Sequence, residues 1–409
     1  MGSVIAIDSI MGAGKTTWII NLMKNNPNDK YIYVGVLLTE LNRIKKSTPE
    51  LNFKEPSSDK WGVTKKDDLH RLIVNGENIV TSHSLMKNFD LDIEEFLDDY
   101  TIILDEELEI AKSIKVKTGI RKELIENEKI IINEKGKVSW NEKKYNHVDT
   151  YNEDNRLKEI AKNNCLYYID GGFFVWVMPP SIFKKSKKVY LLSYMIKESV
   201  IHGYLTENKI SIEFVYPFTK EEEKIRKKAK DLIEIIDIPT FNKGNIGTLL
   251  SQPSSLSYNF FKKNRISISN KAKILTSIRN WLQKNNIKND RVLFTTYKDF
   301  KHVGIKNGIS GFGIRSYAKT WIYPKCRATN EYADKDVVIY CANIFPNSGV
   351  EKYLHHSSNF NISRKKYALS NALQFIYRSA IRKDKKIQII IPSVAVKNLI
   401  IDWIDGKDI

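Results

Sequence analysis

The sequence has few cysteines and no long apolar run. Cys165, Cys326 and Cys341 form neither a CxxC pair nor a metal-ligand spacing, so they indicate structural thiols in a reducing compartment. No apolar run reaches the roughly 18 residues that a membrane-spanning helix needs, and no basic-then-apolar leader begins the chain. These absences predict a cytoplasmic protein, in the host cytoplasm if a phage encodes it, with no membrane partner.

Acidic residues are also in short supply. The chain of 409 residues has 48 Asp and Glu against 66 Lys and Arg, which gives a formal net charge of +18. Such an excess favours a polyanionic partner such as nucleic acid. The alternative explanation is a biased proteome, because Lys, Asn and Ile are abundant throughout, as AT-rich coding would produce. Charge alone leaves both explanations open.

The sequence has no internal repeat and no low-complexity tract, and it is too long for one ordinary core, so we expect two domains. Short apolar runs alternate with amphipathic stretches, which predicts parallel sheets covered by helices on both faces. The expected strands are 4–7, 31–38, 78–82, 101–104 and 189–193, then 291–295, 337–342 and 387–391. A charged helix over 218–236 separates the two sets. We expect an N-terminal domain of residues 1–215, with a hairpin insertion near 129–144, and a C-terminal domain of residues 216–409.

A glycine-rich loop follows the first expected strand. The segment DSIMGAGKTT, residues 8–17, has the strand, loop and helix order of a phosphate-binding loop, although Ser9 stands where the pattern GxxxxGK[ST] has glycine. Glycines let successive backbone N–H groups point at phosphates, and the helix N-terminus adds partial positive charge. Lys15 is expected to reach the phosphates of ATP and Thr16 to bind Mg²⁺. The residues expected to bind the nucleotide are Ser9, Met11, Gly12, Ala13, Gly14, Lys15, Thr16 and Thr17.

An acidic pair ends another expected strand, in the segment YTIILDEELEIA. Asp105 is expected to bind Mg²⁺ together with Thr16, and Glu106 to polarise the attacking water. Acidic residues also favour the first turn of a helix, so the pair by itself has an ordinary structural explanation. Its occurrence after the glycine-rich loop favours a nucleotide-hydrolysing site.

Together these segments resemble the superfamily 2 helicases and DNA-dependent ATPases of the DEAD/DEAH type, in particular phage-encoded relatives of replication origin-binding ATPases. Asp105-Glu106-Glu107-Leu108 resembles the DEAD/DEAH box. The segments 34–44, 79–86, 189–196, 292–300 and 325–340 resemble further motifs of that superfamily, and Ser193 matches its Ser-Ala-Thr motif. The resemblance implies nucleic-acid contacts by Thr39, Arg43, Thr81, His83, Thr295, Thr329 and Asn330.

The segment SNALQFIYRSAIRKDKK resembles the last motif of the same superfamily, Gln-x-x-Gly-Arg-x-Gly-Arg. Gln374, Arg378 and Arg382 are spaced by four residues, which predicts that they lie on one face of a helix. The resemblance implies that they are catalytic and that one arginine reaches the γ-phosphate. In the superfamily the second arginine follows the first by three residues, so the assignment stays open between Arg378 and Arg382. The alternative is a basic amphipathic helix.

The resemblance implies two tandem RecA-like P-loop domains with a nucleotide cleft between them, and ATP and Mg²⁺ as cofactors. The expected function is an ATP-dependent DNA helicase or translocase of phage replication or recombination. Single-stranded or forked DNA is the expected partner, RNA is the alternative, and replication proteins are candidate further partners of a monomer.

Four other functions fit part of the sequence. A DNA-packaging motor ATPase would carry a C-terminal nuclease with clustered carboxylates, where this chain has the Gln/Arg segment. A small-molecule kinase would be about half as long. A non-catalytic DNA clamp would not keep Lys15, Thr16, Asp105 and Glu106 together. A DNA-dependent ATPase that tracks duplexes without unwinding them is not separated from a helicase by these residues.

Two aromatic features have both a functional and a structural interpretation. The stretch 166–183, LYYIDGGFFVWVMPPSIF, is either a base-stacking surface or a buried strand, and burial is the commoner role of such residues. Trp140 in the expected hairpin is either a strand-separating pin or part of an ordinary insertion.

Overall fold

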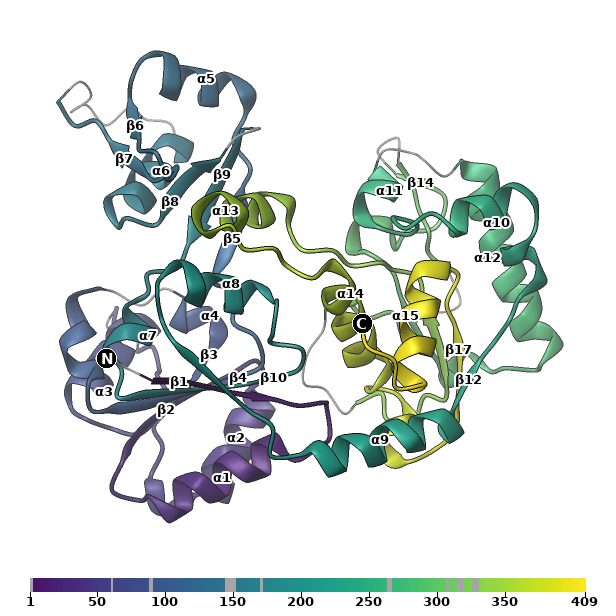
Figure 1. Cartoon of the computed structure of the whole chain (residues 1–409), viewed down its shortest axis with the longest axis horizontal. Helices are drawn as coiled ribbons and strands as arrows, with labels where there is room; N and C mark the ends of the chain where they lie inside the picture. Colours follow the sequence, from purple (N-terminus) through teal and green to yellow (C-terminus); the bar gives the residue numbers. More distant parts are fainter. Residues whose placement is uncertain are drawn as a thin grey trace. The chain divides into compact units, whose positions relative to one another are not determined.

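The computed structural model describes residues 3–59, 62–87, 91–143, 152–169, 172–262, 267–306, 309–314, 320–325 and 331–409. They form two compact units (Figure 1). The first unit is Met1–Ser9, Gly14–Pro217 and Pro346–Ser363, and the second is Ile10–Ala13, Phe218–Phe345 and Arg364–Ile409. No helix within these described ranges is long and apolar enough to cross a membrane.

A six-stranded sheet forms the centre of the first unit, and all its pairings are parallel. Its strands, in spatial order, are β11 (Ile212–Val215), β1 (Ser3–Asp8), β10 (Lys188–Ser193), β4 (Tyr100–Asp105), β2 (Lys30–Gly35) and β3 (Ile79–Ser82). The central strands are short apolar runs buried on both faces, as parallel strands usually are. The strands expected at 4–7, 78–82, 101–104 and 189–193 are therefore confirmed. The strand expected over 31–38 is shorter, since it ends at Gly35 and α2 begins at Leu38.

Helices cover both faces of this sheet (Figure 1). On one face lie α1 (Lys15–Asn25) and α2 (Leu38–Ser47), and on the other α7 (Ser181–Lys185) and α8 (Val200–Glu207). The remaining helical segments are η1 (Pro49–Leu51), α3 (Lys65–Val74), α4 (His83–Met86) and η2 (Leu91–Leu97). Strand residues such as Ile32 and Ile102 share one core with Phe183 and Tyr204. This burial of apolar side chains is the main favourable contribution to folding.

An insertion separates β4 from β10 along the chain. Its elements are β5 (Ala111–Ile114), α5 (Thr118–Glu126), β6 (Ile130–Ile132), β7 (Val138–Trp140), α6 (Asn152–Lys162), β8 (Leu166–Ile169) and β9 (Phe173–Val177). β6 and β7 form the expected hairpin, and β5, β9 and β8 form a small antiparallel sheet. The hairpin turn needs glycine at Gly136, because its φ is +77° and a Cβ there would lie 2.6 Å from the carbonyl oxygen of Tyr168.

One helix of the first unit comes from late in the chain. α13 (Ser348–Ser358) packs on α8 and on the small sheet of the insertion. Its side chains Val350, Tyr353 and Leu354 are buried in the same core as Tyr204. The sequence places residues 346–363 after the boundary expected at 215/216, yet they pack in the first unit because α8 offers the apolar surface that α13 requires.

The second unit has a four-stranded parallel sheet in the order β12 (Ile233–Ile235), β17 (Ile387–Ile390), β16 (Val337–Tyr340) and β13 (Val292–Thr295). Ile274 and Ile278 of α12 (Ile268–Lys284) pack on one face with Val292. On the other face, the Phe375 ring of α14 (Arg364–Ile376) contacts the Tyr340 ring with centroids 5.4 Å apart. The α/β class with parallel sheets between helices is therefore confirmed in both units.

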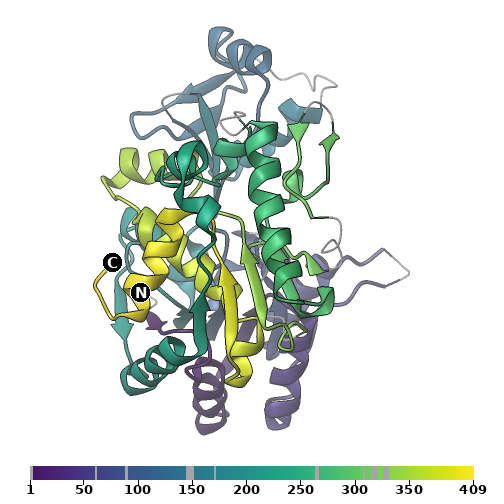
Figure 2. The same ribbon diagram turned by 90° about the vertical axis from the view of Figure 1, so that its right-hand side faces the viewer.

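The remaining elements of the second unit are α9 (Thr219–Leu232), η3 (Pro239–Asn242), α10 (Gly244–Leu250), α11 (Tyr258–Lys262), η4 (Asn289–Arg291), η5 (Lys298–Phe300), β14 (Ile305–Lys306), β15 (Ile309–Ser310), η7 (Ala380–Lys383) and α15 (Val394–Ile404). Figure 2 shows this unit from the side that lies to the right in Figure 1. The charged helix expected over 218–236 is shorter, because Ile233 and Ile235 leave it and pair with β17 as an edge strand.

Candidate active site

The carboxyl ends of β1, β10 and β4 meet at one edge of the first sheet, because the three strands are parallel neighbours. Backbone hydrogen bonds connect the residue after β1 and the residue after β4 to the end of β10. The backbone N–H of Ser9 donates to the carbonyl oxygen of Ser193 at 2.9 Å, and the N–H of Glu106 donates to that of Leu192, also at 2.9 Å. Ligands of open parallel sheets usually bind at this edge.

The glycine-rich loop has the backbone conformation that a phosphate-binding loop needs. Gly12 and Gly14 have φ values of +87° and +108°, which side chains with a Cβ rarely adopt. The space beside Gly12 is open, since a Cβ there would meet no atom within 4 Å. Lys15 begins α1, and its Nζ donates to the carbonyl oxygen of Ser9 at 2.5 Å. The loop therefore presents its lysine at the start of a helix.

The N-terminus of α1 is suited to an anion. The first N–H groups of any helix lack partners within the helix, and here Gly14, the N-cap residue, has no side chain to accept from them. The first turn of α1 also carries no acidic residue. Backbone donors and the partial positive charge of the helix end therefore face whatever binds beside Gly12.

The acidic pair lies where electrostatic effects oppose one another. The pKa of the Asp105 carboxyl is raised to about 6, by burial first and by the charge of the neighbouring Glu106 second, whereas the hydrogen bond from Tyr33 and the charge of Lys15 act to lower it. Asp105 ends β4 and Lys15 follows the loop after β1, and both strands pair with β10. The structure thus brings the lysine and the acidic box that the sequence singled out to the same edge of the sheet.

Two residues at this edge have a strained backbone. Glu106 has a φ of +71° and Met195 a φ of +58°, both in the left-handed region that such residues seldom occupy. The loop that carries Met195 is held by Asp8, whose carboxylate accepts from the N–H of Met195 at 2.7 Å and from that of Ile196 at 3.0 Å. Asp8 therefore links the start of the phosphate-binding loop to the loop after β10. The sequence analysis assigned no role to it.

Three of the residues expected to contact nucleic acid, Thr39, Arg43 and His83, lie near this edge of the sheet. Thr39 and Arg43 are exposed, one turn apart on α2, and Arg43 is within 3.4 Å of Glu40. His83 at the start of α4 lies with its Nε2 2.9 Å from the carbonyl oxygen of Asp105. The histidine therefore belongs to the surroundings of the acidic pair.

The other residues in that group are placed differently. Thr81 on β3 is 2% exposed and Thr295 on β13 is 0% exposed. The hydroxyl of Thr295 donates to the carbonyl oxygen of Ile322 at 2.8 Å. Neither threonine side chain lies at the surface in this structure. Thr329 and Asn330 lie outside the described residues.

The last predicted motif does not form a single helix. α14 ends at Ile376, so it contains Gln374 but neither arginine. The hydroxyl of Ser379 donates to the Ile376 carbonyl oxygen at 2.6 Å, and extended backbone at Ser379 (φ −78°, ψ −171°) redirects the chain. The expectation that all three residues share one helical face is therefore wrong. Arg378 is 4% exposed, whereas Arg382 is exposed on η7.

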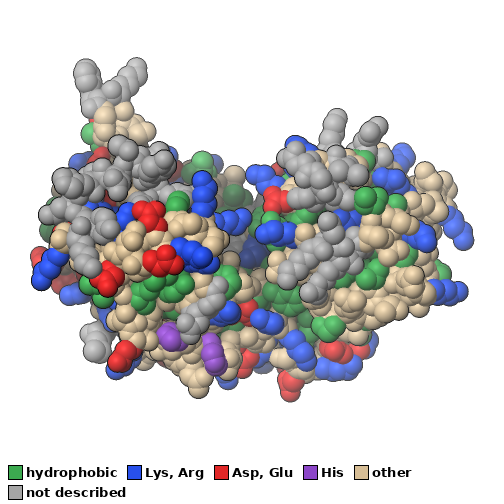
Figure 3. Space-filling view, turned by 90° about the horizontal axis from the view of Figure 1, so that it is seen from above, with side chains coloured by type: hydrophobic (Ala, Val, Ile, Leu, Met, Phe, Trp, Pro, Cys, Tyr) green, Lys and Arg blue, Asp and Glu red, His purple; other side chains and the backbone are tan. Residues whose placement is uncertain are grey.

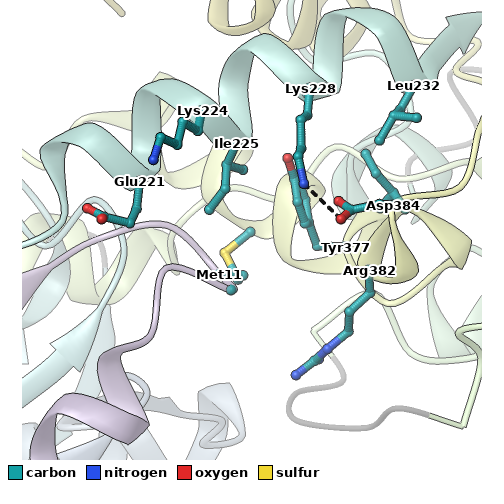
Figure 4. Close-up of a pocket in the computed structure, with 12 residues that line it drawn as sticks. Met11, Glu221, Lys224, Ile225, Lys228, Leu232, Tyr377, Arg382 and Asp384 are labelled. Atoms are coloured by element: carbon teal, nitrogen blue, oxygen red, sulfur yellow. Dashed lines mark hydrogen bonds and ion pairs between the residues drawn. The ribbon is translucent and has the colours of Figure 1, made fainter.

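A cavity of about 360 Å³ adjoins the glycine-rich loop (Figure 4). Its lining residues are Met11 and Gly12 of that loop, Glu221, Lys224, Ile225, Lys228, Ala229 and Leu232 of α9, and Tyr377, Ile381, Arg382 and Asp384. Within the lining, the Lys228 Nζ lies 2.8 Å from the Asp384 carboxylate. The loop is also held to α9 directly, because the N–H of Ile10 donates to Glu222 at 2.8 Å.

The sequence analysis missed the contribution of α9 to this cavity. A signal was present, since Ile225, Ala229 and Leu232 recur at helical spacing in an otherwise charged helix and so form a narrow apolar stripe. The stripe indicates that other residues cover one side of α9, but the sequence does not identify those residues. The fold shows that Met11 is one of them.

The aromatic stretch 166–183 is mostly core. Phe174 and Phe183 are 1% and 0% exposed, and Phe173 and Trp176 are partly buried against the same core. Trp140 of the hairpin packs against a small cluster of the insertion, and Lys158 lies 5.8 Å from its ring centroid. These contacts support the structural interpretation of both features.

Comparison with known proteins identifies the family of the chain. Residues 227–404 match the family model described as "YonV C-terminal Rossmann-like domain". The whole chain is 31% identical over 424 residues to the "SPbeta prophage-derived uncharacterized protein YonV" of Bacillus subtilis (strain 168), with 100% of both proteins covered. The chain belongs to the YonV family.

Solved structures similar to this YonV-family chain include XPD helicases. "Structure of S. tokodaii Xpd4" is 10% identical, with 100% of this chain and 94% of that chain covered, and a TM-score of 0.49. "XPD_Helicase" is 11% identical, with 99% and 95% covered, and a TM-score of 0.48. At these identities and TM-scores the likeness concerns the fold, and the chemistry of the site has to be argued from its own residues.

The residues at the sheet edge of this YonV-family chain fit a magnesium nucleotide. The Thr16 hydroxyl and the Asp105 carboxylate are oxygen ligands of the kind that Mg²⁺ prefers. Lys15 and the N–H groups at the start of α1 suit the phosphates. Glu106 adds a carboxylate beside the expected metal ligand, where a water could be polarised.

Proposed function

We propose that this protein hydrolyses ATP with Mg²⁺ and uses the reaction to move along nucleic acid, most favourably DNA. The observation that carries the proposal is the position of Lys15, after the loop that follows β1, and of the Asp105-Glu106 pair, at the end of β4, at one edge of the sheet, since β1 and β4 both pair with β10. A phosphate-binding loop without an acidic partner would only bind nucleotide. The two together supply what hydrolysis requires.

Each residue has a distinct role in this proposal. The N–H groups of the loop and the Lys15 ammonium hold the phosphates and neutralise charge that develops on them. Thr16 and Asp105 hold Mg²⁺, which neutralises phosphate charge when bound. Glu106 orients the attacking water and accepts its proton. Arg382 or Arg378 supplies a further positive charge toward the γ-phosphate.

The cavity beside Gly12 supports binding of the rest of the nucleotide. It is directly adjacent to the loop, and its walls combine apolar groups from Met11, Ile225 and Tyr377 with the charged Arg382 (Figure 4). Apolar walls with a few convergent polar groups are typical of small-molecule sites. We assign the base and ribose to this cavity.

Nucleic acid is the partner that the charge favours. The net charge is +18, and Figure 3 shows Lys and Arg side chains spread over the face it displays. Backbone phosphates would supply most of the affinity, so binding would be largely independent of sequence and would weaken with salt. The DNA that we propose as partner is single-stranded or forked. We further propose that the protein is a monomer, that it acts in the host cytoplasm, and that it serves phage replication or recombination. The prophage origin named for the Bacillus relative supports the last of these.

The alternatives are a DNA-packaging motor and a DNA-dependent ATPase that does not unwind duplexes. The described residues contain no group of three or more His, Cys, Asp or Glu that could hold a metal ion, and the second unit lines the cavity with Arg382, which disfavours a packaging nuclease. The choice between unwinding and tracking needs an assay.

The test is the ATP hydrolysis rate with no nucleic acid, single-stranded DNA, duplex DNA and RNA. We expect hydrolysis that single-stranded or forked DNA stimulates most, and displacement of one strand from a labelled fork. Stimulation without strand displacement would support the non-unwinding ATPase. Absence of hydrolysis under all four conditions would overturn the proposed function.

A further inference from the structure

A buried tyrosine contacts the acidic box from the neighbouring strand. Tyr33 on β2 is 0% exposed, and its hydroxyl donates to Asp105 Oδ2 at 2.5 Å. The contact follows from the register, since Tyr33 pairs with Ile103 of β4, and Asp105 lies two residues further on the same face of that strand. The hydroxyl is thus directed at one chosen oxygen of the carboxylate.

Burial alone does not explain this contact. Tyr31 lies two residues earlier on the same strand, is also 0% exposed, and donates its hydroxyl to the backbone carbonyl oxygen of Asn26 at 2.9 Å. A neutral carbonyl therefore suffices to satisfy a buried phenol in this core. Tyr33 instead donates to the side-chain carboxylate of Asp105. Hydrogen bonds to ionised groups are the stronger kind, so the carboxylate is held firmly.

The contact leaves the two oxygens of the carboxylate unequal. The Tyr33 hydroxyl has one proton to donate, and the geometry directs it at Oδ2. Because Oδ2 is engaged, Asp105 is restrained from rotating, and Oδ1 is the oxygen left for another partner.

We infer that Tyr33 is a positioning residue for the cation of this site: it fixes the carboxylate of Asp105 so that one oxygen is reserved for a divalent metal ion. The inference rests on the proposed function for its setting. It assigns to β2 a role in metal binding that the sequence analysis gave only to Thr16 and Asp105. Partners that orient a metal ligand in this way typically matter about 10–100-fold for metal affinity.

The test compares two substitutions that each remove one buried hydroxyl from the same strand, Tyr33→Phe and Tyr31→Phe. Mn²⁺ affinity in the presence of ADP is measured from the electron paramagnetic resonance signal of free Mn²⁺. ATP hydrolysis is measured separately as a function of Mg²⁺ concentration. We expect Tyr33→Phe to weaken Mn²⁺ binding about tenfold and to raise the Mg²⁺ concentration for half-maximal hydrolysis by a similar factor. Its rate at saturating Mg²⁺ should fall less.

Tyr31→Phe should leave both metal measurements at the wild-type level while costing similar thermal stability. If Tyr33→Phe binds Mn²⁺ as tightly as wild type, or if wild-type protein with ADP binds no Mn²⁺, the inference is overturned. If Tyr33→Phe is less stable than wild type, both proteins are compared at a temperature well below its melting temperature. In the Asp105→Ala background, Tyr33→Phe should cause no further loss of Mn²⁺ affinity. A wild-type protein that binds Mn²⁺ with ADP but hydrolyses nothing would overturn the proposed function and leave the inference standing.

Discussion

Acidic side chains beside the two parallel sheets have different surroundings. In the first unit, burial and the neighbouring Glu106 raise the pKa of Asp105 to about 6. In the second unit, Asp336 lies just before β16 and accepts hydrogen bonds from Arg291, including Nε to Oδ1 at 2.9 Å and Nη2 to Oδ2 at 2.8 Å. The charged form of Asp105 therefore lowers the stability of the folded state. The ion pair of Asp336 with Arg291 raises that stability.

Backbone strain does not separate the two units in the same way. Glu106 and Met195, both at the carboxyl edge of the first sheet, have positive φ values, and so does Leu256 in the second unit, with a φ of +56°. Strain of this kind persists where the surrounding structure enforces it, and it is commonest at functional sites. The two units therefore differ in the surroundings of their carboxylates, since Asp105 is buried beside Glu106 and Asp336 is paired with Arg291.

The largest expected effect is that of Lys15→Ala. The ammonium is the main positive charge beside Asp105, so its loss should lower ATP hydrolysis by more than about 10³-fold, through weaker nucleotide binding and lost charge stabilisation. The thermal unfolding temperature should change little, because Lys15 is only partly buried. Steady-state hydrolysis and a melting curve check this. Normal turnover would sink the assignment of the first unit as the nucleotide site.

Glu106→Gln should have the next largest effect. The amide keeps the shape and cannot accept a proton, so hydrolysis should fall about 10²–10³-fold while ATP still binds. Nucleotide affinity is measured by fluorescence titration and turnover by phosphate release. If turnover persists at the wild-type rate, Glu106 is only a residue of the loop after β4, and another base must be sought.

The two arginines of the second unit sharpen the comparison further. Arg382 is exposed and lines the cavity. Arg382→Ala should lower DNA-stimulated ATP hydrolysis on the order of tenfold or more, because a hydrogen bond to a charged group is lost. Thermal stability should not change. Arg378 is 4% exposed, so Arg378→Ala should also destabilise the fold, by about 1–3 kcal/mol.

Urea unfolding and stimulated hydrolysis are measured for both arginine variants. Lysine at position 378 should not restore the wild type, because an ammonium does not reproduce the planar guanidinium. If both alanine variants have the stability and the ATP turnover of the wild type, the second unit supplies no arginine to the reaction.

The smallest expected effects test the comparison of Asp105 and Asp336 directly. The raised pKa of Asp105 means that its charged form costs stability as the pH rises from its ordinary value near 3.8 through about 6. Asp105→Asn should therefore stabilise the protein above pH 6 by about 1–3 kcal/mol and change little near pH 4. Asp336→Asn should instead destabilise it by about 0.5–1 kcal/mol, since the pair is partly exposed.

These stability measurements are made by urea unfolding in EDTA, so that no metal ion contributes. If Asp105→Asn is less stable than wild type at neutral pH, the charged form of Asp105 does not destabilise the folded state.

How far the sequence predicts this structure depends on what positions each residue. Asp105 and Ser193 end short apolar runs of the kind that form buried parallel strands, and Lys15 follows the loop after another such run, so their convergence was predictable. Arg378 and Arg382 were not predictable in the same way, because α14 ends at Ile376 and the extended backbone at Ser379 redirects the chain. The hydrogen bond between Tyr33 and Asp105 depends on the register of β2 on β4, which spacing along one strand does not reveal.

The position of α13 has a consequence for how the protein is made. The core of the first unit includes Val350, Tyr353 and Leu354, but nearly all of the second unit's sequence up to Phe345 is synthesised before them. A nascent chain released as far as Pro217 therefore has an N-terminal unit whose α8 surface is still uncovered. The unit that begins first on the ribosome is completed only after residues 346–363 emerge.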